Sequence, residues 1–127
     1  MKSPGHQQHP EHKVREEPLH DRTVKVEFNG ETIAQSKDVI KLIEDGAPVR
    51  YYFSRSDVRM ELLTPGAATS ECPFKGHATY FDLQAGGQTL KDAVWTYETP
   101  YEEHDALAQR LAFYDDKYPA IRVTLAD

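Results

Sequence analysis

The sequence predicts a mainly β protein: a compact antiparallel β-hairpin domain with one or two short helices. Two observations carry this prediction. Apolar and polar residues alternate with a period of two in several stretches, as they do when one face of a strand is buried. Between these stretches stand the turn signals Asn29-Gly30, Asp45-Gly46 and Gly86-Gly87, which join neighbouring strands into hairpins.

The length and composition limit the domain organisation and the setting. A chain of 127 residues, 39% apolar and 28% charged, is expected to form a single globular β domain over residues 21–127. It has no apolar run of about 18 residues, so no membrane partner is expected. The first 18 residues lack the apolar stretch of a secretory signal. A single cysteine cannot form an internal disulfide, which favours a reducing, cytoplasmic setting.

The charge balance bears on partners. The formal net charge is -6, and residues 1–20 contribute three basic and three acidic side chains, so the excess lies in residues 21–127. An acidic body lacks the basic footprint that binds a phosphate backbone, so no nucleic-acid partner is expected. A local basic pocket for a small ligand is compatible with this balance.

Residues 1–20 differ from the rest in composition. They hold four of the six histidines (His6, His9, His12 and His20) and almost no large apolar residue. Such a segment buries too little apolar surface to offset the entropy of ordering, so we expect a disordered His-rich tail. Spaced histidines can also capture a metal ion, but a solvated tail is the simpler interpretation, and no metal site is predicted.

The first two hairpins follow from the alternation around their turns. In TVKVEFNGETIAQS, alternate residues are apolar on either side of Asn29-Gly30, and VIKLIEDGAPVRYYF has the same pattern around Asp45-Gly46. Two-residue loops fix the register of the strands. The expected pairs are Phe28 with Glu31 and Val26 with Ile33 in the first hairpin, and Leu42 with Val49 and Ile40 with Tyr51 in the second.

Helices are expected at two places. Ser56 can cap a short helix over SDVRMELL, in which Val58 and Leu62 share one face, and Pro65-Gly66 would end it. The sequence TPYE at residues 99–102 has the form of a capping box, with proline at the first helical position, and begins a helix to about residue 109. The last strands are expected at LAFY and at the alternating residues 121–125.

The third hairpin, around Gly86-Gly87, determines which face the cysteine shares. Counting back from the turn predicts four pairs: Asp82 with Lys91, Tyr80 with Ala93, Ala78 with Trp95, and Gly76 with Tyr97. Because side chains alternate between faces, a strand that continues to Cys72 places its thiol beside Trp95 and Tyr97. Lys75 would then point to the opposite face, near Glu98.

Several segments together resemble a known family. RYYFSRSDVRMELL, CPFKGHATYFDL, DAVWTYETP and LAFY occur in this order, and the combination is similar to small, mostly bacterial proteins of the domain of unknown function 427 family. The family is sometimes labelled nucleotidyltransferase-like. The resemblance covers about residues 22–117 and leaves the histidine-rich segment outside.

The resemblance implies a fold and a chemistry. The fold it implies has tent-like or small barrel-like sheets, similar to methionine sulfoxide reductase B and related zinc proteins. The nucleotidyltransferase label implies nucleotide and metal chemistry. This chain lacks the paired cysteines that bind structural zinc in those proteins, so zinc is not carried over, and no cofactor is identified.

Chemistry-bearing residues gather in two segments. The candidate ligand-binding residues are Arg55, Asp57, Arg59, Lys75, Gly76, Trp95 and Tyr97, and the candidate nucleophile is Cys72. Two arginines four residues apart can bind a carboxylate or phosphate through paired N–H groups. A structural interpretation exists for each group: an internal arginine–aspartate ion pair, a buried cysteine packed as a small apolar residue, and aromatic core residues.

Three functions remain open on these residues. The favoured one is a binding protein for a small anionic ligand, with nucleotides included in that class, in a cleft between the turn at residues 55–59 and the hairpin of residues 72–97. The second is a thiol-dependent enzyme that uses Cys72, whose thiolate would need a cationic neighbour and an oriented base. The third is a protein–protein interaction module without catalysis, which would use exposed strand edges.

Overall fold

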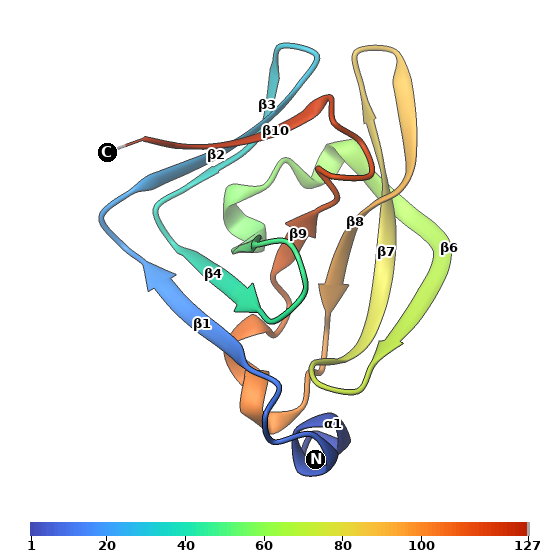
Figure 1. Ribbon diagram of the computed structural model, residues 1–127. Coiled ribbons are helices and arrows are strands. Elements are labelled where there is room, and N and C mark those ends of the chain that lie inside the picture. Colours follow the sequence, from blue (N-terminus) through green and yellow to red (C-terminus); the bar gives the residue numbers. More distant parts are fainter. Residues whose placement is uncertain (127) are drawn as a thin grey trace.

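The computed structural model describes residues 1–126, and these residues form the mainly β, antiparallel architecture that the sequence predicts (Figure 1). One sheet has seven strands in the order β1-β4-β5-β9-β8-β7-β6, and a second has three in the order β10-β2-β3. The strands are Val14–Leu19 (β1), Thr23–Phe28 (β2), Glu31–Ser36 (β3), Val39–Glu44 (β4), Arg50–Phe53 (β5), Leu63–Cys72 (β6), Gly76–Ala85 (β7), Gln88–Tyr97 (β8), Leu111–Phe113 (β9) and Ile121–Ala126 (β10). No helix among residues 1–126 is long and apolar enough to span a bilayer.

The helical elements are short. They are the α-helix α1 (Pro4–Gln8) and the 3₁₀ turns η1 (Arg55–Asp57), η2 (Met60–Leu62) and η3 (Glu102–Leu107). The helix expected over SDVRMELL is therefore two separate turns, and the first follows Ser54 rather than Ser56. The interruption lies at Val58, whose backbone is extended and forms a β-bridge with Ala34.

Alternation of side chains across the seven-stranded sheet produces two apolar cores. On one face, Phe53, Val94 and Leu111 pack against the three-stranded sheet and form the inter-sheet core. Their chain neighbours Tyr52, Trp95 and Ala112 lie on the opposite face, in a second core that includes Leu107 of η3. Two residues adjacent in sequence can therefore belong to different surfaces of the molecule.

The first hairpin has the predicted turn, with Phe28 opposite Glu31. Further along, a bulge gives Val26 the partner Ala34 in place of the predicted Ile33. Such a bulge inserts an extra residue into one strand, which no turn signal reveals. The last two strands of the chain lie at residues 111–113 and 121–126, at the expected places.

The second hairpin differs from the prediction by one position. The observed pairs are Leu42 with Arg50 and Ile40 with Tyr52, in place of Leu42 with Val49 and Ile40 with Tyr51. The loop is longer than the two residues Asp45-Gly46 suggest, and within it the N–H of Ala47 donates to the carbonyl of Glu44 at 3.2 Å. The one-residue change places Tyr52 in the second core.

The third hairpin has the predicted turn but a shifted far end. Ala85 lies opposite Gln88, as expected. Beyond Leu83 a bulge adds two residues to β8, and the pairs become Ala78 with Tyr97 and Tyr80 with Trp95, while Gly76 lies opposite Cys72. Because the shift is an even number, Trp95 and Tyr97 stay on their predicted face, and Cys72 packs beside the core that holds them. Ala93, which lies in the bulge, packs instead in the inter-sheet core.

The expectation of a disordered tail at residues 1–20 differs from the structure. Residues 4–8 form α1, and residues 14–19 form β1, which pairs with β4 along its whole length. In Figure 1, α1 lies at the bottom of the molecule, beside η3 and the turn between β6 and β7. The contacts that place the segment are mainly hydrogen bonds of polar groups, which an argument from apolar content does not detect.

Asp82 stabilises the bulge of the third hairpin through a hydrogen bond, and replacing it should lower the stability of the protein. The Oδ1 of Asp82 accepts the backbone N–H of Asp92 at 2.8 Å, and Asp92 has the left-handed backbone conformation, with φ +51°. Asp82→Ala leaves this donor unpaired. We expect the free energy of unfolding to fall by about 1–3 kcal/mol in urea denaturation.

Lys91→Ala is the matched control, because among the described residues the exposed side chain of Lys91 forms only an ion pair with Asp82, at 3.5 Å, and the substitution keeps the Lys91 carbonyl and leaves the bulge intact. It should cost about 0.5 kcal/mol or less. Equal losses in the two variants would contradict the role assigned to the bulge.

Candidate functional site

The predicted site residues lie on opposite faces of the seven-stranded sheet. The Nη2 of Arg55 donates to the Oγ1 of Thr96 at 3.4 Å, and its guanidinium stands over the ring of Phe81, on the side of the inter-sheet core. Trp95 and Tyr97 belong to the second core. Among the described residues, Arg55 and the pair Trp95 and Tyr97 therefore do not line one common cleft between the turn at residues 55–59 and the hairpin of residues 72–97.

Arg55, Asp57 and Arg59 do not act together either. The carboxylate of Asp57 accepts the hydroxyl of Ser36 at 2.5 Å, while Arg59 pairs with Glu61 at 3.0 Å and with Glu31 at 3.7 Å. Both the paired arginine fork and the internal arginine–aspartate ion pair were expectations from the spacing. Among the described residues, neither is present.

Arg55 instead lines a surface groove that we call the Arg55 groove. Its walls come from the connection between β5 and η1 and from the loop between η3 and β9, and its volume is about 260 Å³. The lining residues are Ser54, Arg55, Ser56, Ala108, Gln109 and Arg110. The hydroxyls of Ser54 and Ser56 lie 3.0 Å apart and share a hydrogen bond.

Neutral oxygens hold the Arg55 guanidinium. Its Nε donates to the carbonyl of Gln109 at 2.7 Å, in addition to the contact with Thr96. Gln109 has a φ of +67°, a left-handed conformation that is uncommon for a residue other than glycine. No carboxylate within residues 1–126 forms an ion pair with Arg55, so its charge is not neutralised by a neighbour.

Arg110 is the second cation of the groove, and no pattern in the sequence pointed to it. Its Nη2 contacts the carboxylate of Asp38 at 3.0 Å, and its Nη1 donates to the carbonyl of the same residue at 2.9 Å. The Arg110 charge is thus balanced by Asp38. Because Asp38 balances only Arg110, the groove and its immediate supports carry one excess positive charge.

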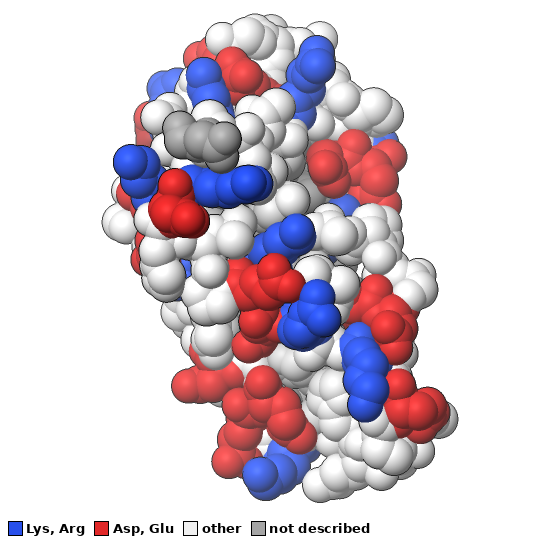
Figure 2. Space-filling view, turned by 60° about the vertical axis from the view of Figure 1, so that its left-hand side comes forward, with Lys and Arg blue, Asp and Glu red and all other residues white. Residues whose placement is uncertain are grey.

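Arg55 differs from the cations of this acidic protein that form ion pairs. On the face shown in Figure 2, basic and acidic side chains are interspersed. Many form pairs, such as Arg15 with Glu17 at 3.0 Å and Lys25 with Glu27 at 3.5 Å. Exposed pairs of this kind add little to stability, but they do reduce the local positive potential.

Lys75 lies on the opposite face from the one that the strand parity predicted. Its Nζ contacts the Oε1 of Glu44 at 2.5 Å rather than approaching Glu98, and the side chain is only 10% exposed. The parity argument fails here because β7 begins at Gly76, so Lys75 belongs to the turn. The other carboxylate oxygen of Glu44 contacts the Nε2 of His12 at 2.9 Å.

These contacts set the protonation of the buried groups. Burial raises the pKa of Glu44, but the hydrogen bonds from Lys75 and His12 outweigh it and leave the pKa below its ordinary value. Burial raises the pKa of both Tyr52 and Tyr97, so both phenols are neutral at pH 7. In this region the charged groups are therefore Lys75 and Glu44, and the two tyrosines are neutral.

Cys72 is half-buried and packs beside the second core. No residue in the described part of the chain forms a hydrogen bond or an ion pair with its thiol. The hydroxyl of Tyr52, next to this region, accepts the indole N–H of Trp95 at 3.2 Å. The surroundings of Cys72 correspond to core packing, and the oriented base that a nucleophile requires does not contact it.

Gly76 is needed for the approach of another backbone segment. Its φ of +131° suits glycine, and a Cβ there would lie 3.3 Å from the Cα of Pro100. The carbonyl of Lys75 accepts the N–H of Tyr101 at 2.9 Å in the same region. The space that the sequence suggested for a ligand beside Gly76 is therefore occupied by the chain itself.

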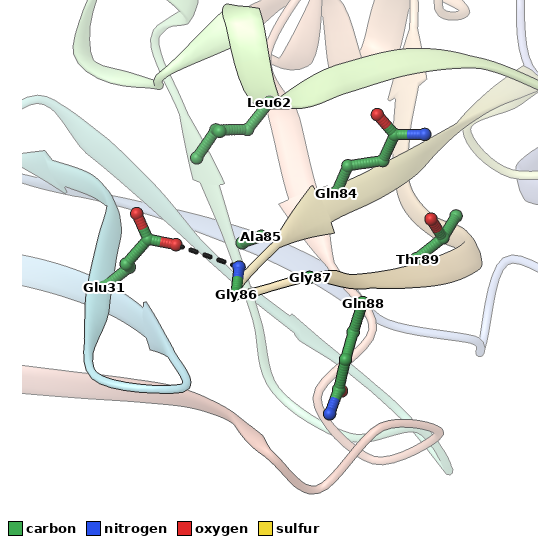
Figure 3. Close-up of a pocket in the computed structure, with 8 residues that line it drawn as sticks. All are labelled: Glu31, Leu62, Gln84, Ala85, Gly86, Gly87, Gln88 and Thr89. Atoms are coloured by element: carbon green, nitrogen blue, oxygen red, sulfur yellow. Dashed lines mark hydrogen bonds between the residues drawn. The ribbon is translucent and has the colours of Figure 1, made fainter.

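Two further openings carry acidic side chains. A pocket of about 530 Å³ surrounds the turn at residues 86–87, and its single charged lining residue is Glu31, which accepts the N–H of Gly86 at 3.2 Å (Figure 3). A second groove, of about 350 Å³, is lined by Glu31, Asp57 and Arg59 among others. Within residues 1–126, no group of three or more metal-ligating side chains is arranged to hold a metal ion.

The ion pair between Lys75 and Glu44 predicts a pH-dependent loss of stability. Glu44→Gln leaves the Lys75 cation buried without an anion, and the free energy of unfolding at pH 7 should fall by about 3 kcal/mol. The folded-state pKa of Glu44 is depressed, so its stabilisation is present above about pH 4.3 and disappears as the pH falls through the lower folded value. Urea denaturation at pH 7 and pH 3 measures both effects.

The double variant Glu44→Gln, Lys75→Met is the control, because it removes both charges and should recover most of the loss at pH 7. A cost that is the same at both pH values would contradict the assignment to the ion pair.

Comparison with known proteins agrees with the resemblance in the sequence. No curated protein matches the chain. Residues 17–124 match the family described as Domain of unknown function (DUF427), a span that includes every β-strand from β2 to β10 except the last two residues of β10. Residues 1–16, with α1 and the first half of β1, lie outside the match. Since the match covers most of the chain, the protein belongs to the domain of unknown function 427 family.

Proposed function

We propose that this protein binds a small anion, either a phosphate group or a carboxylate, in the Arg55 groove. The observation that carries the proposal is the state of the Arg55 guanidinium. It is held in place by the carbonyl of Gln109 and the hydroxyl of Thr96, and no carboxylate of the described residues neutralises it. A fixed, uncompensated guanidinium is pre-organised for an anion, because little side-chain entropy is lost on binding.

The groove also offers donors beside that charge. The Nη1 of Arg55 forms no hydrogen bond with the described residues, and the hydroxyls of Ser54 and Ser56 lie next to it in the lining. Guanidinium and hydroxyl donors together match the oxygens of a phosphate or carboxylate. Hydrogen bonds between charged partners are about twice as strong as those between neutral groups.

The size of the groove restricts the ligand class. A volume of about 260 Å³ lies below the usual range of about 300–1,000 Å³ for sites that enclose drug-sized molecules. It suits inorganic phosphate or a small carboxylate. A nucleotide would place one phosphate in the groove and leave its base outside, so the base should add little affinity.

The two openings that contain Glu31 are less suited to an anion. The pocket at residues 86–87 has a carboxylate as its only charged group, and the groove at Arg59 has two carboxylates against one guanidinium. Arg59 is also paired with Glu61 and Glu31. The electrostatic argument therefore selects the Arg55 groove among these three.

Titration calorimetry with inorganic phosphate at low ionic strength tests the proposal. We expect a Kd of about 1 mM, a binding free energy of about -4 kcal/mol. Arg55→Gln should weaken binding by about tenfold to a hundredfold, the effect of losing a charged hydrogen bond. Arg55→Lys should fall between the two, since lysine keeps the charge but loses the planar fork.

Arg59→Gln is the matched control: it removes an arginine four residues away, whose charge is already paired, and should leave the affinity unchanged. A parallel titration with sodium chloride at equal ionic strength excludes a general salt effect. If phosphate does not bind, or binds Arg55→Gln as tightly as the wild type, the proposal is wrong.

A further inference from the structure

Residues 1–13 cover the turn between β6 and β7, and we call them the N-terminal cover. The Oγ of Ser3 donates to the carbonyl of Pro73 at 2.8 Å, and the N–H of Gly5 donates to the same oxygen at 2.8 Å. The N–H of Ser3 also donates to the carboxylate of Glu103 in η3, at 2.9 Å. The cover is thus fixed to two elements of the body by polar contacts.

The apolar part of this contact is centred on Phe74. The ring of His12 stacks on Phe74 with centroids 4.2 Å apart, and the ring of His6 meets it edge-on at 5.0 Å. A Cβ on Gly5 would lie 2.8 Å from the Phe74 ring, so the backbone of α1 rests directly on that ring. Because so little apolar surface is buried, this segment belongs to the low-stability end of the structure.

A pair of histidines joins the cover to η3. The Nε2 of His6 lies 2.8 Å from the Nε2 of buried His104, and the Nδ1 of His104 contacts the carboxylate of Glu16 at 2.9 Å. His104 donates its Nδ1 proton to Glu16, so a single proton between the two Nε2 atoms completes the hydrogen bond. When both rings are cationic, each Nε2 carries a proton, and the contact places two donors and two positive charges together.

The charges around His6 come from several elements. Burial lowers the pKa of His6 and the charge of His104 lowers it further, as does His12 in the cover. Glu103 of η3 and Glu44 of β4 raise it, and the net direction is downward. An undocked cover would bind the proton more readily, so docking is favoured above the ordinary histidine value of about 6.5 and weakens as the pH falls below it.

We propose that the N-terminal cover is a pH-dependent strap, docked on the turn of residues 73–75 at neutral pH and released in mild acid when a second proton enters the contact between the two Nε2 atoms of His6 and His104. Release frees the carbonyl of Pro73 and exposes the ring of Phe74. It also breaks the contact of His12 with Glu44, the carboxylate that pairs with Lys75. The strap therefore controls access to the turn that follows Cys72.

Hydrogen exchange of the full chain, read by mass spectrometry over residues 1–13 and corrected for the intrinsic exchange rate at each pH, tests the strap. In the wild type, protection of the amides of Gly5 and His9, both hydrogen-bonded in the docked cover, should fall about tenfold between pH 7.5 and pH 5.5. His6→Gln should keep its protection at pH 5.5, because its amide can donate to His104 without taking up a proton.

His9→Gln is the matched control, since His9 lies in the same segment, is 60% exposed and contacts only Glu11 among the described side chains. It should keep the wild-type pH dependence. Two results would overturn the proposal: protection in the wild type that does not change with pH, or a loss in His6→Gln equal to that of the wild type.

A second variant covers the case in which His6→Gln fails to dock at either pH. Glu16→Gln removes the anion that stands beside the histidine pair, so adding a second proton to the pair becomes less favourable and the release midpoint should move to lower pH. The body keeps its pairing of β1 with β4, which the backbone provides. An unchanged midpoint would show that the histidine pair does not control release.

Discussion

The alternation of side chains across the seven-stranded sheet is the constraint on which the rest of the structure depends. Thr96 and Trp95 are neighbours in β8, yet Thr96 supports Arg55 on one face and Trp95 packs in the second core on the other. No movement of a side chain brings the two faces together, because the sheet lies between them. Residues that look like one site in the sequence are therefore divided into two regions with different chemistry.

The two regions differ in whether a carboxylate of the protein balances the buried or fixed cation. On the side of the second core, Lys75 is buried and its charge is balanced by Glu44, so this pair carries no net charge. Arg55 is held by oxygens without charge, and its groove is open to solvent. A buried cation requires its partner in the protein, whereas a cation at the surface can take its partner from solution. This difference, and not the number of basic residues, separates a structural ion pair from a candidate ligand site.

The predictions that rested on turn signals and strand parity were more accurate than those that needed a loop length or a contact between distant residues. The turn at Gly86-Gly87 and the face shared by Cys72 and Trp95 were correct, because the bulge in β8 shifts the register by two and preserves parity. The predicted register of the second hairpin was wrong by one residue, since its loop is longer than the turn signal Asp45-Gly46 indicates. The neighbours of Lys75 could not be predicted, because a residue in a turn has no strand parity and Glu44 comes from a distant strand.

The N-terminal segment shows the same limit in energetic terms. A scarcity of apolar residues predicted disorder, and the docked segment does bury little apolar surface beyond Phe74. What holds it is a set of hydrogen bonds in which histidines take part, and a histidine bond depends on protonation in a way that an apolar contact does not. The same composition therefore explains why docking depends on conditions. Few apolar contacts keep the docking free energy of residues 1–13 small. The hydrogen bond between His6 and His104 makes that free energy depend on pH.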